Sequence, residues 1–213
     1  MMEEARVKPY ISDGLVFHLD GADATDTTWV DRVAGVIFTL TGATPNGKGV
    51  VFNTTRKNDV AVPNSIPTSI SSVNGNNGTI EVCAYRSISA ATECLYTTNR
   101  YSIQYVVDGD HIALSSSNAT ASYSPRAPLP NGREIGLFMH SCNANINCYN
   151  GMAVTPGSKT YKTMYDYRVG NNAARAIPFR GTIYQIRIYN RQLSLEEMRF
   201  NQEQDRKRYG IQF

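Results

Sequence analysis

The sequence predicts an all-β sandwich of two antiparallel sheets with one short helix near the C-terminus. Short runs of alternating apolar and polar residues recur along the chain, separated by clusters of Gly, Asn, Pro and Ser. The period changes to helical spacing only once, at Ser194. A chain of 213 residues with 41% hydrophobic content can fold as a single domain that buries roughly 70% of its unfolded surface.

The alternating runs predict strands in chain order at residues 35–40, 58–62, 101–107, 111–115 and 134–142. Asp108-Gly109 and Asn150-Gly151 predict type I′ hairpin turns, because both residue types tolerate the positive φ that these turns require. The polar segments 63–78 and 118–132 predict long loops at one rim of the sandwich.

The last strand and the helix are expected to follow each other directly. Within residues 183–190, alternation places Ile183, Gln185, Arg187 and Tyr189 on one face, and Tyr184, Ile186, Ile188 and Asn190 on the other. Ser194 and Glu197 have the spacing of a capping box and predict a helix over residues 194–208. We expect this helix to pack across a sheet edge.

A set of apolar residues in these runs forms the expected core. They are Leu15, Phe17, Phe52, Ile80, Val82, Leu137, Met139, Ile186 and Ile188.

Residues 180–198 read RGTIYQIRIYNRQLSLEEM. This wording resembles the closing element of laminin-G-like domains, which belong to the concanavalin-A-like β-sandwich superfamily. Weaker blocks at residues 14–21, 49–53, 78–85, 148–151 and 167–170 are similar to earlier strands of that family. The resemblance implies a concanavalin-A-like jelly roll over residues 11–213, preceded by an N-terminal arm at residues 1–10.

The resemblance also allows catalysis to be examined. Glucanases of this superfamily carry paired carboxylates on one strand, as nucleophile and general acid. Here Glu81 is followed on the same face by Cys83 and Tyr85, so the second carboxylate is missing. We therefore expect no enzyme activity. His18, His111 and His140 also lack the spacing of a zinc site.

The acidic segment at Asp20, Asp23 and Asp26 is a candidate calcium site, because hard cations prefer several carboxylate oxygens close together. The alternative is a solvated loop with Asx-turns. No other cofactor is expected.

Carbohydrate binding requires aromatic rings beside planar polar groups. The candidates are Tyr96, Asn99, Arg100, Tyr123, Asn171 and Asn172. For any single tyrosine, packing in a half-buried strand is the simpler interpretation.

Charge, apolar runs and cysteines limit the remaining possibilities. A formal charge of +3, with one basic cluster at residues 206–208, does not favour nucleic-acid binding. No apolar run is long enough for membrane insertion, and residues 1–8 lack the apolar core of a leader. Cys142 and Cys148 could form a disulfide in an oxidising compartment or remain thiols.

Three functions are compatible with these observations. The first is a non-catalytic recognition or assembly module, in its strongest version a bacteriophage virion protein. The opening residues 14–17 resemble laminin-G-like modules of capsid-decoration, fibre and tail proteins. Its partners would be other virion proteins, copies of itself and a cell-surface glycan at the loop rim, with the N-terminal arm holding a neighbour. The alternative is a secreted or cell-surface lectin whose leader has been removed, and the third is a degenerate glucanase.

Overall fold

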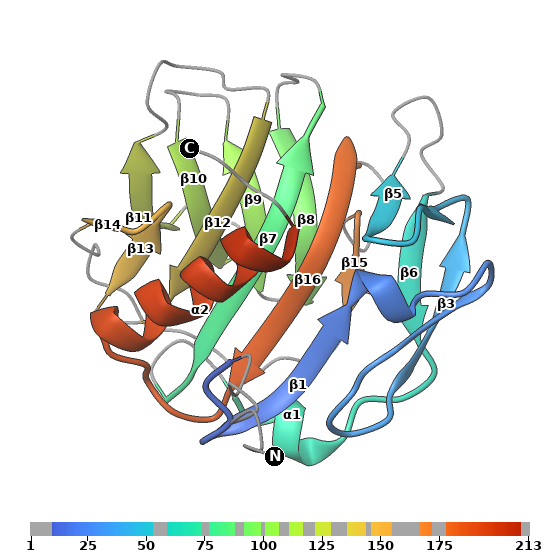
Figure 1. Ribbon diagram of the computed structural model, residues 1–213, viewed down its shortest axis with the longest axis horizontal. Helices are drawn as coiled ribbons and strands as arrows, with labels where there is room; N and C mark the ends of the chain where they lie inside the picture. Colours follow the sequence, from blue (N-terminus) through green and yellow to red (C-terminus); the bar gives the residue numbers. More distant parts are fainter. Residues whose placement is uncertain are drawn as a thin grey trace, which may run out of the picture.

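The computed structural model shows two antiparallel sheets packed face to face, with a helix lying across the outside of one of them (Figure 1). It describes residues 10–52, 59–73, 77–87, 92–98, 101–106, 111–116, 122–128, 136–143, 146–154, 167–171 and 178–209. Within these ranges each sheet has eight strands, and the predicted all-β sandwich with one C-terminal helix is confirmed.

The sheet that carries the helix is called the helix-bearing sheet. It comprises β1 (Leu15–Asp20), β4 (Thr44–Pro45), β5 (Val50–Phe52), β7 (Thr79–Arg86), β12 (Gly136–Cys142), β13 (Asn147–Tyr149), β14 (Met152–Val154) and β16 (Gly181–Tyr189). Its order is β14-β13-β12-β7-β16-β5-β4, and β1 pairs with the second half of β16. The central strands β7 and β16 therefore come from opposite halves of the chain.

The opposite sheet has the order β11-β10-β9-β8-β15-β6-β3-β2. Its strands are β2 (Thr28–Val30), β3 (Ile37–Thr41), β6 (Val60–Pro63), β8 (Thr92–Thr98), β9 (Tyr101–Val106), β10 (His111–Ser116), β11 (Ser122–Pro128) and β15 (Arg168–Val169). A short 3-10 helix, η1 (Gly21–Asp23), and the one-turn helix α1 (Thr68–Ser71) lie in the connections.

Apolar side chains from both sheets meet between them and form the main core. Of the predicted core residues, six belong to it: Phe17, Phe52, Ile80, Val82, Ile186 and Ile188. Met139 is also buried, but it packs with Cys83 on the helix side of its sheet, where Leu137 is only half-buried. Leu15 is likewise half-buried on that side and contacts the cluster around Tyr189 and Met198.

Helix α2 (Leu195–Tyr209) begins where the capping box predicts. The Ser194 N–H donates to Glu197 Oε2 at 2.8 Å, and the Glu197 N–H donates to Ser194 Oγ at 3.2 Å. The predicted position at a sheet edge is wrong. The helix crosses the outer face of the sheet over β12, β7 and β16 (Figure 1), because polar side chains on both surfaces bond to each other there.

A bulge corrects the predicted faces of β16. The pairing with β7 shifts register between Ile183 and Gln185. Ile183 consequently joins the main core with Ile186 and Ile188, whereas Tyr184 packs on the helix side. The predicted shared face of Gln185, Arg187 and Tyr189 is correct. One extra residue in a strand exchanges the faces on either side of it.

The predicted loops and turns agree with the structure in part. The loop expected at residues 118–132 contains β11, and the one at 63–78 contains α1. Asn150 and Gly151 have φ values of 46° and 78°, which confirms a left-handed turn between β13 and β14. The turn predicted at Asp108-Gly109 lies outside the described residues.

Cys142 and Cys148 are free thiols in the structure. They lie on adjacent strands but on opposite faces of the sheet. Cys142 belongs to the main core, and Cys148 packs beneath α2. No disulfide can join them in this fold, because their side chains point apart.

Within the described ranges, no helix has both the length and the apolar character that crossing a membrane requires.

Candidate functional site

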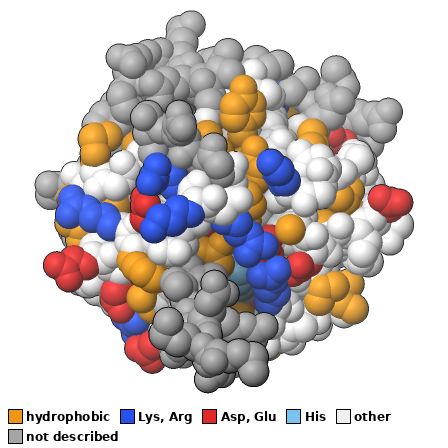
Figure 2. Space-filling view, in the orientation of Figure 1, with side chains coloured by type: hydrophobic (Ala, Val, Ile, Leu, Met, Phe, Trp, Pro, Cys, Tyr) orange, Lys and Arg blue, Asp and Glu red, His pale blue; other side chains and the backbone are white. Residues whose placement is uncertain are grey.

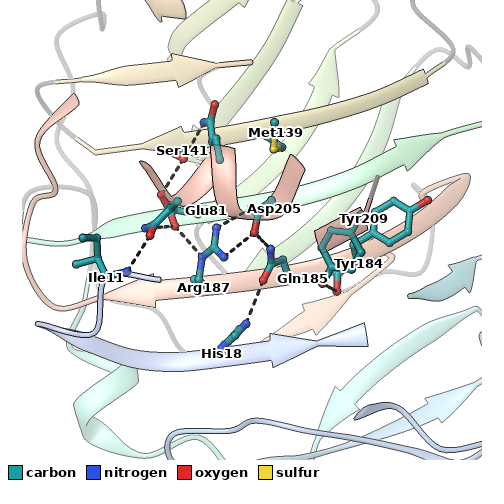
Figure 3. Close-up of polar contacts among 12 residues, drawn as sticks. Ile11, His18, Glu81, Met139, Ser141, Tyr184, Gln185, Arg187, Asp205 and Tyr209 are labelled. Atoms are coloured by element: carbon teal, nitrogen blue, oxygen red, sulfur yellow. Dashed lines mark hydrogen bonds and ion pairs between the residues drawn. The ribbon is translucent and has the colours of Figure 1, made fainter. Parts of the chain in front are cut away.

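A buried polar layer lies between the helix-bearing sheet and α2, with Arg187 at its centre (Figure 3). The Arg187 Nε donates to Glu81 Oε2 at 2.8 Å. Its Nη1 and Nη2 donate to the two oxygens of Asp205, at 2.9 and 2.7 Å. One guanidinium thus joins β16 to β7 and to α2.

Amide and hydroxyl groups complete the hydrogen bonding of Glu81. Ser141 Oγ donates to Glu81 Oε1 at 2.9 Å, and Asn201 Nδ2 donates to Glu81 Oε2 at 2.9 Å. Gln202 Nε2 in turn donates to Ser141 Oγ at 3.0 Å. These donors satisfy the hydrogen-bonding capacity of a carboxylate that is buried away from water.

The layer continues to β1 through Gln185 and His18. The Gln185 amide donates to Asp205 Oδ1, and its Oε1 lies 3.1 Å from His18 Nε2. This orientation of the amide assigns the proton to His18 Nε2. Burial, aided by Arg187, lowers the pKa of His18 to about 3, so the ring is neutral. The Tyr10 ring covers Arg187, with 4.3 Å between the guanidinium carbon and the ring centroid.

The buried layer holds α2 against the sheet, and its two carboxyl groups are closed to a substrate. Most glycoside hydrolases use two carboxyl groups that reach a substrate. Here Glu81 and Asp205 are only 2% and 1% exposed, and both bind the same guanidinium. Substrate could reach neither group without displacing α2.

A pocket opens beside this layer, between α2 and the β13–β14 turn. Its volume is about 390 Å³. It is lined by Met139, Asn150, Gly151, Arg199, Gln202, Glu203 and Arg206. Figure 2 shows Lys and Arg side chains gathered across the middle of the same face, where α2 lies.

Hydrogen bonds between the turn and the helix hold the pocket walls. The Gly151 N–H donates to Gln202 Oε1 at 2.7 Å, and Arg199 Nε donates to the Gly151 carbonyl at 2.8 Å. Asn150 Oδ1 accepts from the Met139 N–H at 2.8 Å. The two sides of the pocket are therefore tied together before any ligand arrives.

Two of the three predicted calcium ligands, Asp20 and Asp23, are paired with arginines. Asp20 is fully buried, and its Oδ2 lies 2.8 Å from Arg32 Nη1 and 2.6 Å from Arg208 Nη2. Asp23 accepts a second bond from Arg32 at 2.8 Å, and Asp26 is exposed. Among the described residues, no group of three metal-ligating side chains is placed to hold a metal ion. Calcium binding remains a prediction, and the ion would have to displace Arg32.

Of the predicted glycan ligands, only Asn171 has a side chain within the described part of the structure. Asn171 is fully buried. Tyr96 lies on β8 and Tyr123 on β11, three strands apart in the opposite sheet and so separated by roughly 14 Å. Their side chains, together with Asn99, Arg100 and Asn172, lie outside the described part.

Sequence reasoning missed the pocket residues on α2. Arg199, Gln202, Glu203 and Arg206 recur at spacings of three and four, which places them on one side of a helix. That spacing was the available signal. The helical spacing does not predict that Arg199 contacts the β13–β14 turn, which lies 48 residues earlier in the chain.

Comparisons with known proteins support the fold. No protein-family profile matches the chain, and no curated protein sequence does. Among solved structures, the chain is similar to Trypanosoma rangeli sialidase in complex with sialic acid, with TM-score 0.63 and 16% identity. The match covers 90% of this chain but only 33% of that one, so the chain spans about a third of the sialidase.

Two further solved structures are similar over most of the chain. One is domain 4 of AbnA, an extracellular GH43 arabinanase from Geobacillus stearothermophilus, in complex with arabinotriose. Its TM-score is 0.59 at 15% identity, covering 87% of this chain and 96% of that domain. The other, botulinum neurotoxin type C, has a cell entry that depends on two ganglioside molecules. It matches with TM-score 0.66 and 7% identity, over 89% of this chain and 51% of that one. At these identities the likeness shows the fold alone.

Proposed function

We propose that the chain is a non-catalytic carbohydrate-binding β-sandwich module. The observation that carries this proposal is the likeness to domain 4 of AbnA over nearly the whole of both chains, since that domain was solved with a bound arabinotriose. The sialidase and the neurotoxin are also named with a sugar ligand. A fold hosts many functions, so the proposal requires a direct binding test.

The buried polar layer supports the absence of catalysis. Glu81 is the acid on the central strand, and Arg187, Ser141 and Asn201 occupy its carboxylate oxygens. A general acid must reach the glycosidic oxygen, either directly or through one water molecule. A carboxylate that is buried under α2 and bonded on both oxygens is suited to hold the helix instead.

The narrower proposal is that the module belongs to a bacteriophage virion, where it would contact other virion proteins and copies of itself. It rests on the resemblance of the sequence to laminin-G-like modules. Residues 1–9 of the arm on which it depends lie outside the described residues, whereas Tyr10 at its end is buried against His18 and Arg187 of the same chain. A secreted or cell-surface lectin is the alternative location for the same binding function.

A glycan array combined with a reducing-end assay tests the main proposal. We expect retention of at least one glycan class and no release of reducing ends from β-glucan, arabinan or sialylated substrates. Release that disappears in Glu81→Gln would identify an enzyme, whereas failure to retain any glycan would reject the binding module. An unchanged melting temperature must accompany each negative result.

Deleting residues 1–8 tests the virion proposal separately. The isolated domain should keep nearly the same melting temperature, because residues 11–209 contain the sheets and α2. Incorporation into particles should be lost. Normal incorporation of the truncated chain would reject the role of the arm.

A further inference from the structure

Two arginines, Arg199 and Arg206, line the pocket beside α2. Arg206 donates from Nε and Nη2 to both oxygens of Glu203, each at 2.6 Å, so these two charges compensate each other. Arg199 uses its Nε for the Gly151 carbonyl. In the described ranges no carboxylate pairs with Arg199, and the pocket lining therefore carries one uncompensated positive charge.

Arg199 is held in place by its Nε, and no group among the described residues bonds to its two outer nitrogens. The bond from its Nε fixes the guanidinium against the β13–β14 turn. That turn is itself fixed, because Gln202 accepts from the Gly151 N–H at 2.7 Å and donates to the Cys148 carbonyl at 3.1 Å. A positioned guanidinium loses little freedom when it binds an anion, which favours affinity.

The other lining groups suit a sugar. The volume of about 390 Å³ lies within the range of small-molecule sites. Met139 forms an apolar part of the pocket wall, with 2% of its surface exposed. Asn150 uses its Oδ1 for the Met139 N–H, and its amide Nδ2, which has no partner among the described residues, can donate to a hydroxyl.

We infer that this pocket binds a sugar that bears a carboxylate, of the uronic or sialic acid class, with Arg199 as the ligand of the carboxylate. The inference deepens the proposed carbohydrate-binding function and rests on it. A carboxylate matches the site in two ways. It is planar, so its two oxygens can accept from the two outer nitrogens of the Arg199 guanidinium, and its single negative charge equals the net positive charge of the lining. A neutral sugar would supply no negative charge to compensate that of Arg199.

The test uses the full chain and matched acidic and neutral sugars. Trigalacturonate is compared with its methyl ester, and sialyllactose with lactose, by isothermal titration calorimetry. We expect one of the two acids to bind and its neutral counterpart to bind at least roughly tenfold more weakly, as for the loss of charge-assisted hydrogen bonds. The two acids distinguish the uronic from the sialic class.

Two variants of α2 locate the site. Arg199→Gln should weaken binding of the acid by roughly tenfold or more. Lys207→Gln removes the same charge from a side chain on the same helix that is 62% exposed and outside the pocket lining. It should change the dissociation constant by less than about twofold, since exposed charges are screened by salt. Melting temperatures of both variants should match that of the wild type.

The outcomes separate this inference from the proposed function. Wild-type affinity in Arg199→Gln, or equal binding of acid and ester, overturns the inference. Retention of a neutral glycan such as arabinotriose with no acidic sugar bound also overturns it, while the carbohydrate-binding function stands. If no acidic and no neutral glycan binds, both are overturned.

Discussion

Arg187 on β16 and Asp205 on α2 form a bidentate ion pair, with nitrogen–oxygen distances of 2.9 and 2.7 Å and with each residue only 1% exposed. The same guanidinium binds Glu81 on β7. One side chain therefore links the last helix to two strands of the sheet and compensates two buried carboxylates.

Removing that cation should be costly. In Arg187→Met, Glu81 and Asp205 would remain buried without a positive partner, and we expect the free energy of unfolding to fall by about 3–5 kcal/mol. Urea unfolding monitored by circular dichroism measures this loss.

Arg206→Gln is the matched control. It breaks an ion pair with Glu203 on the solvent side of the same helix, where water screens the interaction. We expect no measurable change in stability. Equal losses in the two variants would show that the buried layer has no special role.

His18 should make the protein sensitive to acid. Burial, followed in importance by Arg187, lowers its folded-state pKa from the usual 6.5 to about 3. Below pH 6.5, His18 therefore binds a proton in the unfolded chain but stays neutral in the folded chain. The resulting stability is fully present above pH 6.5 and is lost as the pH falls toward 3, by about 1.4 kcal/mol per unit.

Unfolding of the wild type and of His18→Gln between pH 7 and pH 4 tests this expectation. Asp205 acts in the opposite direction, because burial raises its pKa to about 6 against the effect of Arg187. Its contribution is present below its usual pKa and is lost as the pH rises through 6, but it is common to both proteins. The free energy of unfolding of the wild type should therefore fall relative to that of His18→Gln as the pH decreases below 6.5. Parallel curves would contradict the assigned pKa of His18.

The polar layer shows how far the sequence could be interpreted. Alternation correctly placed Gln185, Arg187 and Tyr189 on one face, but polar strand residues ordinarily face solvent. The missed signal was a matching stripe on the helix. Asn201 and Asp205 are one turn apart on α2 and bond to β7 and β16. Two polar surfaces that satisfy each other look like two solvent-exposed surfaces when each is considered alone.

Tertiary pairing decided the other differences. The bulge at Tyr184 arises from register with β7, which local alternation does not determine. Residues 122–128 contain two prolines and belong to the segment 118–132, for which the polar composition predicts a loop. They form β11, at the end of the opposite sheet, where an edge strand tolerates proline because one side needs no N–H donors.

The capping box can be tested by two substitutions at Ser194. Ser194→Ala removes the oxygen that accepts from the Glu197 N–H, and we expect a loss of about 1 kcal/mol in the free energy of unfolding. Ser194→Asp keeps an acceptor at the cap, so its free energy of unfolding should fall by only about a few tenths of a kcal/mol. Chemical denaturation measures both. Equal losses would mean that the serine oxygen does not cap the helix.

Gly170 should tolerate no side chain, for two separable reasons. Its φ is +83°, and a Cβ at this position would lie 2.1 Å from the ring of Phe52, which is buried in the main core. Gly47 has a similar φ of +80°, but its Cβ would meet nothing within 4 Å. Gly47→Ala should therefore lose only the conformational cost, about 1–2 kcal/mol. Gly170→Ala should lose about 1–3 kcal/mol more, because Phe52 must move within a close-packed core. Urea unfolding of both variants measures the difference, and similar losses would show that the space around Phe52 adapts to a methyl group.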